Sequence, residues 1–358
     1  MQINKEPFGK LSTGEDVSLY TLKNDNSMAV AVTNYGGTIV SLQTPDRNGK
    51  VDDIVLGFGS VEEYGSELYL QSHPYFGCTV GRYSNRLKDG RFVLNGVSHQ
   101  VSQNEGSNSL HGGSKGFDKC LWAVDEDGFT SNDGIGVEMK LVSPDGDQGY
   151  PGKLSVTVRL TLFPDNKLAI DYRAVSDKDT IVSLTNHSYF NLSGEGSGSI
   201  RDHELLIPSD KVLILDSELI PTGEIAPVGG TSLDYTKSTL IGNAMKLDGN
   251  DKITGGYAHT YLLDPADEEL TLAARLEDQA SGRTMEIHTD DPGVLLYTGD
   301  GLDGSLSGKS GRTYEKWGGL CLETQRIPDA PNHPNFPPGI LLAGKEYHST
   351  TVYSFGTK

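Results

Sequence analysis

Alternation of apolar and polar residues is the strongest pattern in this chain. Between residues 154 and 163 every second side chain is apolar, in the order LSVTVRLTLF. The tetrapeptide PDNK at 164–167 is typical of a turn, and alternation resumes over 168–175 as LAIDYRAV. Successive side chains of a strand point to opposite faces, so this pattern predicts a β-hairpin with one buried face and one face in water.

Comparable strand-like segments recur along the chain, whereas helical patterns are confined to 61–67 and 240–246. No stretch resembles an interdomain linker, and no repeat of 20–50 residues is visible. Many short strands with little helix predict an all-β fold, which we expect to be one large antiparallel β-sandwich formed by residues 1–358 as a single domain. Besides the hairpin, strands are expected at 28–33, 92–94, 137–142, 180–186, 205–207, 270–276, 284–288, 293–298, 320–324 and 350–355.

The charge of the chain restricts the kinds of partner that it can bind. Its 49 acidic and 30 basic residues give a net charge of −19. A field of that sign repels phosphate backbones and anionic membrane surfaces, which argues against nucleic acid and membrane as partners. A small neutral substrate is more compatible with this charge than a polyanion.

Cysteine usage and the N-terminal segment indicate the compartment. Cys78, Cys120 and Cys321 are odd in number and form no CxxC pair, which argues against a disulfide scaffold and a zinc ribbon. The first residues, MQINKEPFGKLSTGED, contain no apolar stretch of the kind found in secretory signals. We therefore expect a soluble, cytoplasmic protein. The sequence is compatible with a monomer and with a homodimer.

Two loops and the histidines resemble ligand motifs only weakly. GEGSG at 194–198 lacks the following helix that a phosphate-binding loop needs, and DGND at 248–251 lacks the spacing of an EF-hand. No pair of the nine histidines has the i, i+4 spacing of a helical metal site. We expect no cofactor and no metal, although ligands that converge only in space would escape this test.

The segment TIVSLTNHSY at 180–189 places polar groups in a row. In a regular strand Ser183, Thr185, His187 and Tyr189 would share one face, which is costly in a sandwich unless a polar partner lies against it. A structural role for His187 and a role in proton transfer are both compatible with this pattern.

A carboxylate and several hydrogen-bond donors complete the candidate chemistry. Glu323 lies in the otherwise apolar strand-like segment GGLCLETQ, where an ionised carboxylate needs partners or a raised pKa. Asn85 and Arg86 end GRYSNR, and His111 lies in NSLHGG. Both motifs are rich in turn residues, and these side chains suit sugar hydroxyl groups.

With these residues in view, the chain resembles the aldose 1-epimerase (galactose mutarotase) family almost from end to end. Several ordered motifs together make the resemblance specific. They are PYFG (74–77), GRYSNR (81–86), NSLHGG (108–113), SPDGDQGYPG (143–152), LTNHSYFNL (184–192), LIPTGE (219–224), DPGVLLYTGD (291–300) and CLETQ (321–325).

The resemblance implies a galactose-mutarotase-type β-sandwich with the sugar in an open cleft. It also implies that His187 is the general acid and Glu323 the general base, whereas Asn85, Arg86 and His111 line the sugar site. Interconversion of anomers needs a base at the anomeric hydroxyl and an acid at the ring oxygen. Unperturbed pKa values of about 4.3 and 6.5 let an ionised glutamate and a protonated histidine perform both tasks.

Two positions depart from the family pattern, and both bear on substrate preference. The family usually has an aspartate where this chain has Ala258, and often a glutamine where it has Asp291. We expect Tyr189, which shares the face of His187, and Asp291 to contact the substrate as well, with Asp291 offsetting part of the charge missing at Ala258.

Two other functions remain as alternatives. A non-catalytic sugar-binding or sensing protein of the same fold would keep the sugar-lining residues but would not need both His187 and Glu323. A glycoside hydrolase would need a second carboxylate across the glycosidic bond, and only Glu323 is a strong candidate among these motifs.

Overall fold

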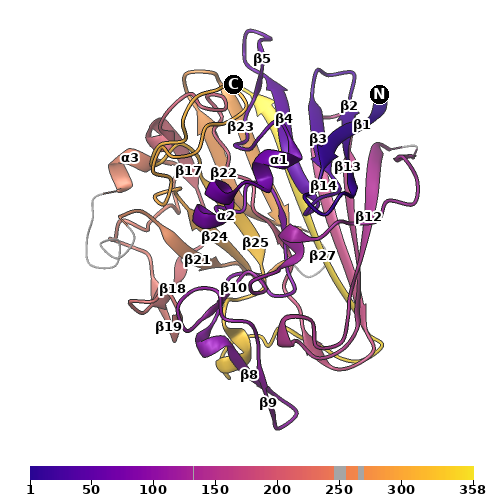
Figure 1. Cartoon of the computed structure of the whole chain (residues 1–358). Helices are drawn as coiled ribbons and strands as arrows, with labels where there is room; N and C mark the ends of the chain where they lie inside the picture. The colour runs from indigo at the N-terminus through magenta and orange to yellow at the C-terminus, as the bar shows by residue number, and fades with distance from the viewer. Residues whose placement is uncertain (132, 246–254, 265–269) are drawn as a thin grey trace.

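The computed structural model describes residues 1–131, 133–245, 255–264 and 270–358 (Figure 1). Within them the strands form three larger sheets and four two-stranded ladders, and every pairing between named strands is antiparallel. The predicted all-β antiparallel sandwich is confirmed. The DGND motif at 248–251 lies outside the described residues.

The largest sheet has nine strands and includes the predicted hairpin. Its order is β11 (Phe129–Thr130), β12 (Ile135–Ser143), β13 (Leu154–Leu162), β14 (Lys167–Ser176), β27 (Glu346–Thr357), β23 (Arg283–Thr289), β22 (Thr271–Asp278), β17 (His203–Leu206) and β20 (Thr239–Leu240). The sheet therefore joins segments from the middle and the C-terminal end of the chain, because β27 lies between β14 and β23.

Two five-stranded sheets complete the larger layers. The N-terminal sheet contains β1 (Gln2–Lys10), β2 (Asp16–Lys23), β3 (Ala29–Thr33), β4 (Thr38–Pro45) and β5 (Val51–Asp53). The other, called here the site sheet, has the order β19 (Pro221–Pro227), β18 (Lys211–Leu215), β21 (Ala258–Leu262), β24 (Gly293–Tyr297) and β25 (Cys321–Gln325).

The two-stranded ladders and the helices are short. The ladders pair β6 (Thr79–Val80) with β16 (Thr185–Asn186), β7 (Arg86–Leu87) with β10 (Ser109–Leu110), β8 (Arg91–Leu94) with β9 (Val97–Gln100), and β15 (Thr180–Ile181) with β26 (Ile340–Leu341). The α-helices are α1 (Val61–Tyr64), α2 (Glu67–Ser72) and α3 (Ile241–Ala244), which overlap the two predicted helical segments. None of the helices in the described residues has the length and apolarity to cross a membrane.

The main core lies between the sheets and is built from alternate strand residues. In β13, Leu154, Val156, Val158, Leu160 and Leu162 are all buried in this core. Burying each such side chain contributes about 1.5–3 kcal/mol, so the alternation that predicts the hairpin also supplies its stability. The pairing of Leu162 with Leu168 sets the hairpin register.

The predicted continuous strand over 180–186 is wrong. Only Thr180–Ile181 and Thr185–Asn186 have strand geometry, because successive backbone groups of this segment bond to unrelated parts of the chain. Val182 N–H donates to Gly339, and Ser183 N–H donates to Arg82. The segment therefore connects separate parts of the chain through backbone hydrogen bonds.

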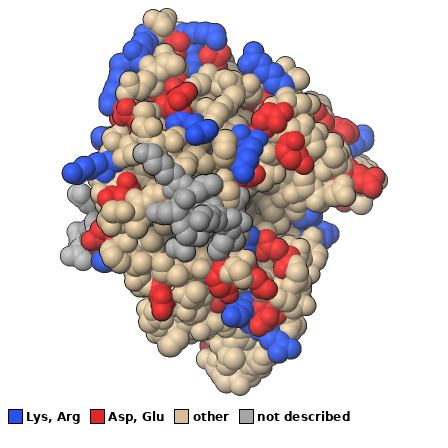
Figure 2. Space-filling view, turned by 90° about the vertical axis from the view of Figure 1, so that its left-hand side faces the viewer, with Lys and Arg blue, Asp and Glu red and all other residues tan. Residues whose placement is uncertain are grey.

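Charged side chains are distributed over the surface. Figure 2 shows one face on which Lys and Arg side chains are interspersed with Asp and Glu. The negative net charge of the chain thus coexists with local mixing of both signs on this face.

Candidate active site

A cavity of about 410 Å³ opens beside the site sheet. Its wall combines the C-terminal end of α2, β7, β10, the segment after β16, the edge of β21, and β24 and β25 with the loop after β24. The volume lies within the usual range for small-molecule sites. His187 and Glu323, far apart in the sequence, both line it, as do Asn85, Arg86, His111 and Tyr189.

Strand alternation places Glu323 in this cavity. Its neighbours in β25 face the sandwich interior, where Leu322 belongs to the main core and the Thr324 hydroxyl lies 2.6 Å from that of Thr351 in β27. Glu323 points the other way and is fully buried. Neither of its carboxylate oxygens has a hydrogen-bond partner among the described residues. A buried carboxylate without partners is costly, which indicates that a ligand supplies its missing donors.

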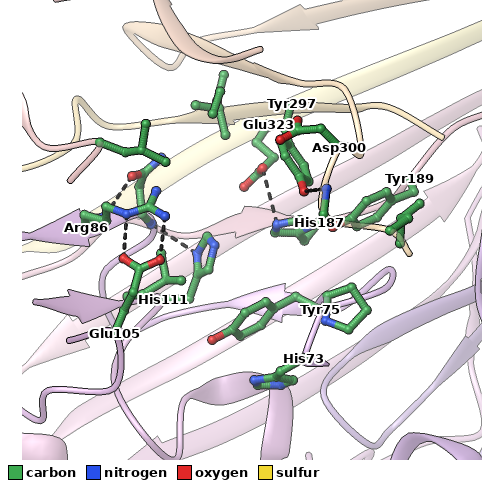
Figure 3. Close-up of a pocket in the computed structure, with 18 of the residues that line it drawn as sticks. His73, Tyr75, Arg86, Glu105, His111, His187, Tyr189, Tyr297, Asp300 and Glu323 are labelled. Carbon is green, nitrogen blue, oxygen red and sulfur yellow. Dashed lines mark hydrogen bonds and ion pairs between the residues drawn. The ribbon is translucent and has the colours of Figure 1, made fainter. Parts of the chain in front are cut away.

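His187 is held by its backbone directly after β16. Its N–H donates to Cys78 at 2.9 Å, and its carbonyl accepts from Gly77 at 3.0 Å. These bonds direct the imidazole toward Glu323, with Nε2 of His187 3.5 Å from Oε1 of Glu323 (Figure 3). The ring of Tyr189 stacks on His187 with the two centroids 5.2 Å apart.

Burial disfavours the charged form of both members of the pair. It raises the pKa of Glu323 to about 8, opposed by the positive charge of Arg86. It lowers the pKa of His187 to about 4. Between these values the pair holds one proton, which in the empty cavity lies on Glu323. The sequence-based expectation of an ionised Glu323 and a protonated His187 contains the same single proton, but places it on the other partner.

His111 presents a proton donor to the cavity. Its Nδ1 accepts a hydrogen bond from the Asn85 backbone N–H at 3.2 Å, and its own backbone N–H donates to Asn85 at 3.0 Å. Burial lowers the pKa of His111 well below its usual value, so the ring is neutral. A neutral imidazole that accepts at Nδ1 carries its proton on Nε2.

Arg86 forms a two-pronged ion pair with Glu105. Its Nε and Nη2 atoms donate to the two carboxylate oxygens, both at 2.6 Å. Two parallel bonds fix the plane of the guanidinium group at the edge of the cavity. Figure 3 shows Arg86 and Glu105 on one side of Glu323 and His187.

His111, His187 and Glu323 are also the residues with the geometry for a metal ion. One potential ligand atom from each lies within 4.8 Å of the others. Binding a metal through Nε2 of His111 would require this ring to move its proton to Nδ1 and lose the bond from the Asn85 backbone. The hydrogen bonding of the described residues thus favours a proton donor at this position over a metal ligand.

Asp291 does not line this cavity, although the sequence predicts that it contacts the substrate. It is buried just before β24, where its carboxylate accepts a hydrogen bond from the Ser349 hydroxyl. Its other oxygen lies 3.5 Å from Nε of Arg326. Asp291 therefore balances the charge of Arg326, whereas Ala258, the first residue of β21, does line the cavity.

Sequence reasoning missed six polar or aromatic residues of the cavity wall. They are Ser72, His73, Tyr75, Glu105, Tyr297 and Asp300. Tyr75, Tyr297 and Asp300 belong to the motifs PYFG and DPGVLLYTGD. Membership in these motifs is the sequence feature that could have identified them as site residues. His73 has no such signal. It follows α2 and adopts a left-handed backbone with φ of +37°, which ends the helix and places its ring 3.9 Å from that of Tyr75.

Comparison with known proteins identifies the family of this chain. The family described as aldose 1-epimerase matches residues 18–354. The chain is 44% identical over 356 residues to a galactose mutarotase of Sus scrofa, covering 99% of each chain. It is 36% identical over 344 residues to an aldose 1-epimerase of Escherichia coli K12, covering 96% of each.

A solved structure has the same fold as this chain. The crystal structure of a galactose 1-epimerase from Lactobacillus acidophilus superimposes with a TM-score of 0.84 at 28% identity, covering 99% of both chains. The match of the family over nearly the whole chain, together with these relatives, shows that this chain belongs to the aldose 1-epimerase family.

Proposed function

We propose that this mutarotase interconverts the α and β anomers of free galactose, glucose or a closely related aldose, with Glu323 as general base and His187 as general acid. The observation that carries the assignment of roles is the unpartnered Glu323 carboxylate, buried in the cavity 3.5 Å from His187. The names of the relatives, galactose mutarotase and aldose 1-epimerase, favour a hexose as substrate.

The reaction needs one proton to leave the sugar and one to arrive. Glu323 takes the proton of the anomeric hydroxyl O1, while His187 gives its proton to the ring oxygen O5, and the C1–O5 bond breaks to leave an aldehyde. Rotation about C1–C2 exposes the other face of the carbonyl. O5 then attacks C1, its proton returns to His187, and Glu323 gives its proton back to O1. No atom or electron is gained or lost.

Sugar binding prepares the pair for this reaction. In the empty cavity the shared proton lies on Glu323, because burial raises the pKa of that carboxyl to about 8. Hydroxyl groups of a bound sugar would donate to the carboxylate and favour its ionised form. The proton then belongs on His187, whose Nε2 is 3.5 Å away.

Four neighbouring residues would orient the ring of the sugar. His111 offers an N–H donor, and Arg86 offers the guanidinium group that Glu105 holds in place. Asn85 directly precedes Arg86, lines the same cavity and bonds to His111 through its backbone. Tyr189, stacked on His187, provides an apolar platform. Such groups act by holding O1 and O5 in reach of the catalytic pair.

Polarimetry on freshly dissolved α-glucose and α-galactose tests the proposal. The purified protein should speed the approach of the optical rotation to equilibrium, and dialysis against EDTA should leave the rate unchanged. Sugar binding in calorimetry without any acceleration would instead identify the non-catalytic binding protein. Release of reducing sugar from glycosides would identify a hydrolase.

We also propose that the protein works in the cytoplasm as a monomer or homodimer and unfolds as a single domain. The unpaired state of Cys78, Cys120 and Cys321 supports a reducing compartment. Cell fractionation, light scattering and a single calorimetric unfolding transition are the corresponding tests.

A further inference from the structure

Asp300 is a cavity carboxylate that the catalytic mechanism does not use. It follows β24 and lines the cavity together with Gly301 and Leu302. The loop around it is firmly held, because Gly301 N–H donates to the Tyr297 hydroxyl at 2.9 Å and Trp317 N–H donates to the Gly299 carbonyl at 3.1 Å. Its position is therefore set by the fold.

Asp300 has no cation in direct contact among the described residues. Its Oδ1 atom is 3.4 Å from the Thr298 hydroxyl, and no lysine or arginine forms an ion pair with it, although the more distant positive charge of Lys316 acts on it. Burial raises the pKa of Asp300 to about 6, so the carboxylate is largely ionised at pH 7. By contrast, the Glu105 carboxylate is occupied by Arg86.

The segment that leads into β21 leaves space for this carboxylate. A Cβ atom on Gly256 would lie only 2.7 Å from Oδ1 of Asp300 and 2.5 Å from the Thr298 hydroxyl oxygen, so glycine is needed there. Two residues later, Ala258 contributes only a methyl group to the cavity wall. The cavity wall thus has small side chains near β21 and a carboxylate at Asp300.

Asp300 and Arg86 flank the catalytic pair. In Figure 3, Arg86 and Glu105 lie on one side of Glu323 and His187, and Asp300 lies on the other. An aldopyranose held over the pair would carry hydroxyl groups toward both sides. An ionised, unpaired carboxylate is a strong acceptor for such groups.

We propose that Asp300 is a substrate-binding residue that accepts hydrogen bonds from hydroxyl groups of the aldose, on the side of the cavity away from Arg86. The inference rests on the proposed function for the nature of the ligand. It assigns Asp300 to recognition of the sugar and leaves the proton transfers to His187 and Glu323.

The test compares wild type, Asp300→Asn and Asp300→Glu, with Asp303→Asn as the matched control. Asp303 lies three residues further along the same loop, is exposed, and accepts a hydrogen bond from the Ser305 N–H. Polarimetry gives KM and kcat for galactose, and calorimetry gives Kd for galactose and its monodeoxy analogues. Thermal unfolding of each variant reports on the fold.

Loss of a charge-assisted hydrogen bond should raise KM and Kd of Asp300→Asn by about ten- to a hundredfold, with kcat within about threefold of wild type. Asp300→Glu should recover part of the affinity, and Asp303→Asn should behave as wild type. One monodeoxy analogue lacks the hydroxyl group that Asp300 contacts. For this analogue, the Kd of Asp300→Asn should differ from that of wild type by less than twofold, because the hydrogen bond is already missing in the analogue.

Three results would overturn the inference. They are an unchanged Kd of Asp300→Asn for every sugar, an equal loss for every deoxy analogue, and an equal loss in Asp303→Asn. Should Asp300→Asn fail to fold, Asp300→Ser and Asp300→Glu carry the same comparison. Absence of mutarotation in the wild type would contradict the proposed function alone, since calorimetry still reads the contribution of Asp300 to sugar binding.

Discussion

Oε1 of Glu323 lies 3.5 Å from Nε2 of His187, in surroundings that disfavour a charge on either side chain. Each group has its pKa moved toward its neutral form, so a single proton belongs to the two of them over a broad pH range. That proton is what the proposed reaction exchanges with the sugar.

Removing either member of the pair should abolish most of the activity. His187→Asn and Glu323→Gln keep the size of each side chain but remove its ability to exchange a proton, and each should lower kcat by about 10²–10⁴-fold. Polarimetric rates measure this loss, and circular dichroism checks the fold. His348→Asn and Glu346→Gln, which alter partly exposed residues of β27, should retain wild-type rates. Near-wild-type rates in both pair variants would show that the roles are misassigned.

The pH profile of kcat/KM should be a broad bell. Below about pH 4, His187 is protonated while Glu323 still holds its proton, so no base remains. Above about pH 8, Glu323 loses its proton while His187 is neutral, so no acid remains. Unperturbed values would instead place the alkaline limb near 6.5. The pH profile of Asp300→Asn should be measured beside that of wild type, because this variant lacks the titrating carboxylate of Asp300. An alkaline limb near pH 6.5 in both proteins would contradict the pKa shifts of His187 and Glu323.

Glu105 should affect the pKa of Glu323 through the charge of Arg86. The positive charge of Arg86 lowers the pKa of Glu323, and Glu105 compensates that charge through two hydrogen bonds. Glu105→Gln leaves Arg86 uncompensated, so the pKa of Glu323 should fall and the alkaline limb should move to lower pH. Arg86→Met should move the limb the opposite way. Equal displacement in both variants would show that Arg86 does not act on Glu323 through its charge.

Introducing an aspartate at position 258 should strengthen sugar binding. Ala258 lines the cavity beside Tyr297, its partner in the β21–β24 pairing. A carboxylate there can accept charge-assisted hydrogen bonds, worth about 1.5–3 kcal/mol, which corresponds to a KM about ten- to a hundredfold lower. Ala258→Asn is the uncharged control.

The same substitution also tests the proximity of Asp300. Two carboxylates in one cavity repel each other, so the gain from Ala258→Asp should be larger in the Asp300→Asn background. A lower kcat/KM for every aldose in both backgrounds would instead indicate a cavity adapted to a different substrate.

The sequence predicts the fold best where each strand has one wet and one buried face. The β13–β14 hairpin follows directly from its alternation, and Glu323 is predicted to be exceptional because the residues just before it, Leu320 to Leu322, are apolar. In the N-terminal sheet β1 is missed, since it reads QINKEPFGK and buries only one of its nine residues. A strand exposed on both faces has no hydrophobic period to detect.

The composition of the cavity is harder to predict from the sequence, because its wall comes from separated segments. Glu105 and Asp300 are ordinary loop carboxylates in the sequence, and only the fold distinguishes the one that pairs with Arg86 from the one that does not. Asp291 is the opposite case. It lies in a matching motif, yet the chain directs its carboxylate to Ser349 and Arg326.

The burial of the Glu323–His187 pair has a consequence for the whole turnover cycle. In the proposed reaction both protons return to the groups that released them when the ring closes, so the cavity exchanges nothing with bulk water. The enzyme form that accepts an α anomer is therefore identical to the form that releases a β anomer. Catalysis in either direction needs no recovery step, and its rate has no reason to depend on the concentration of buffer.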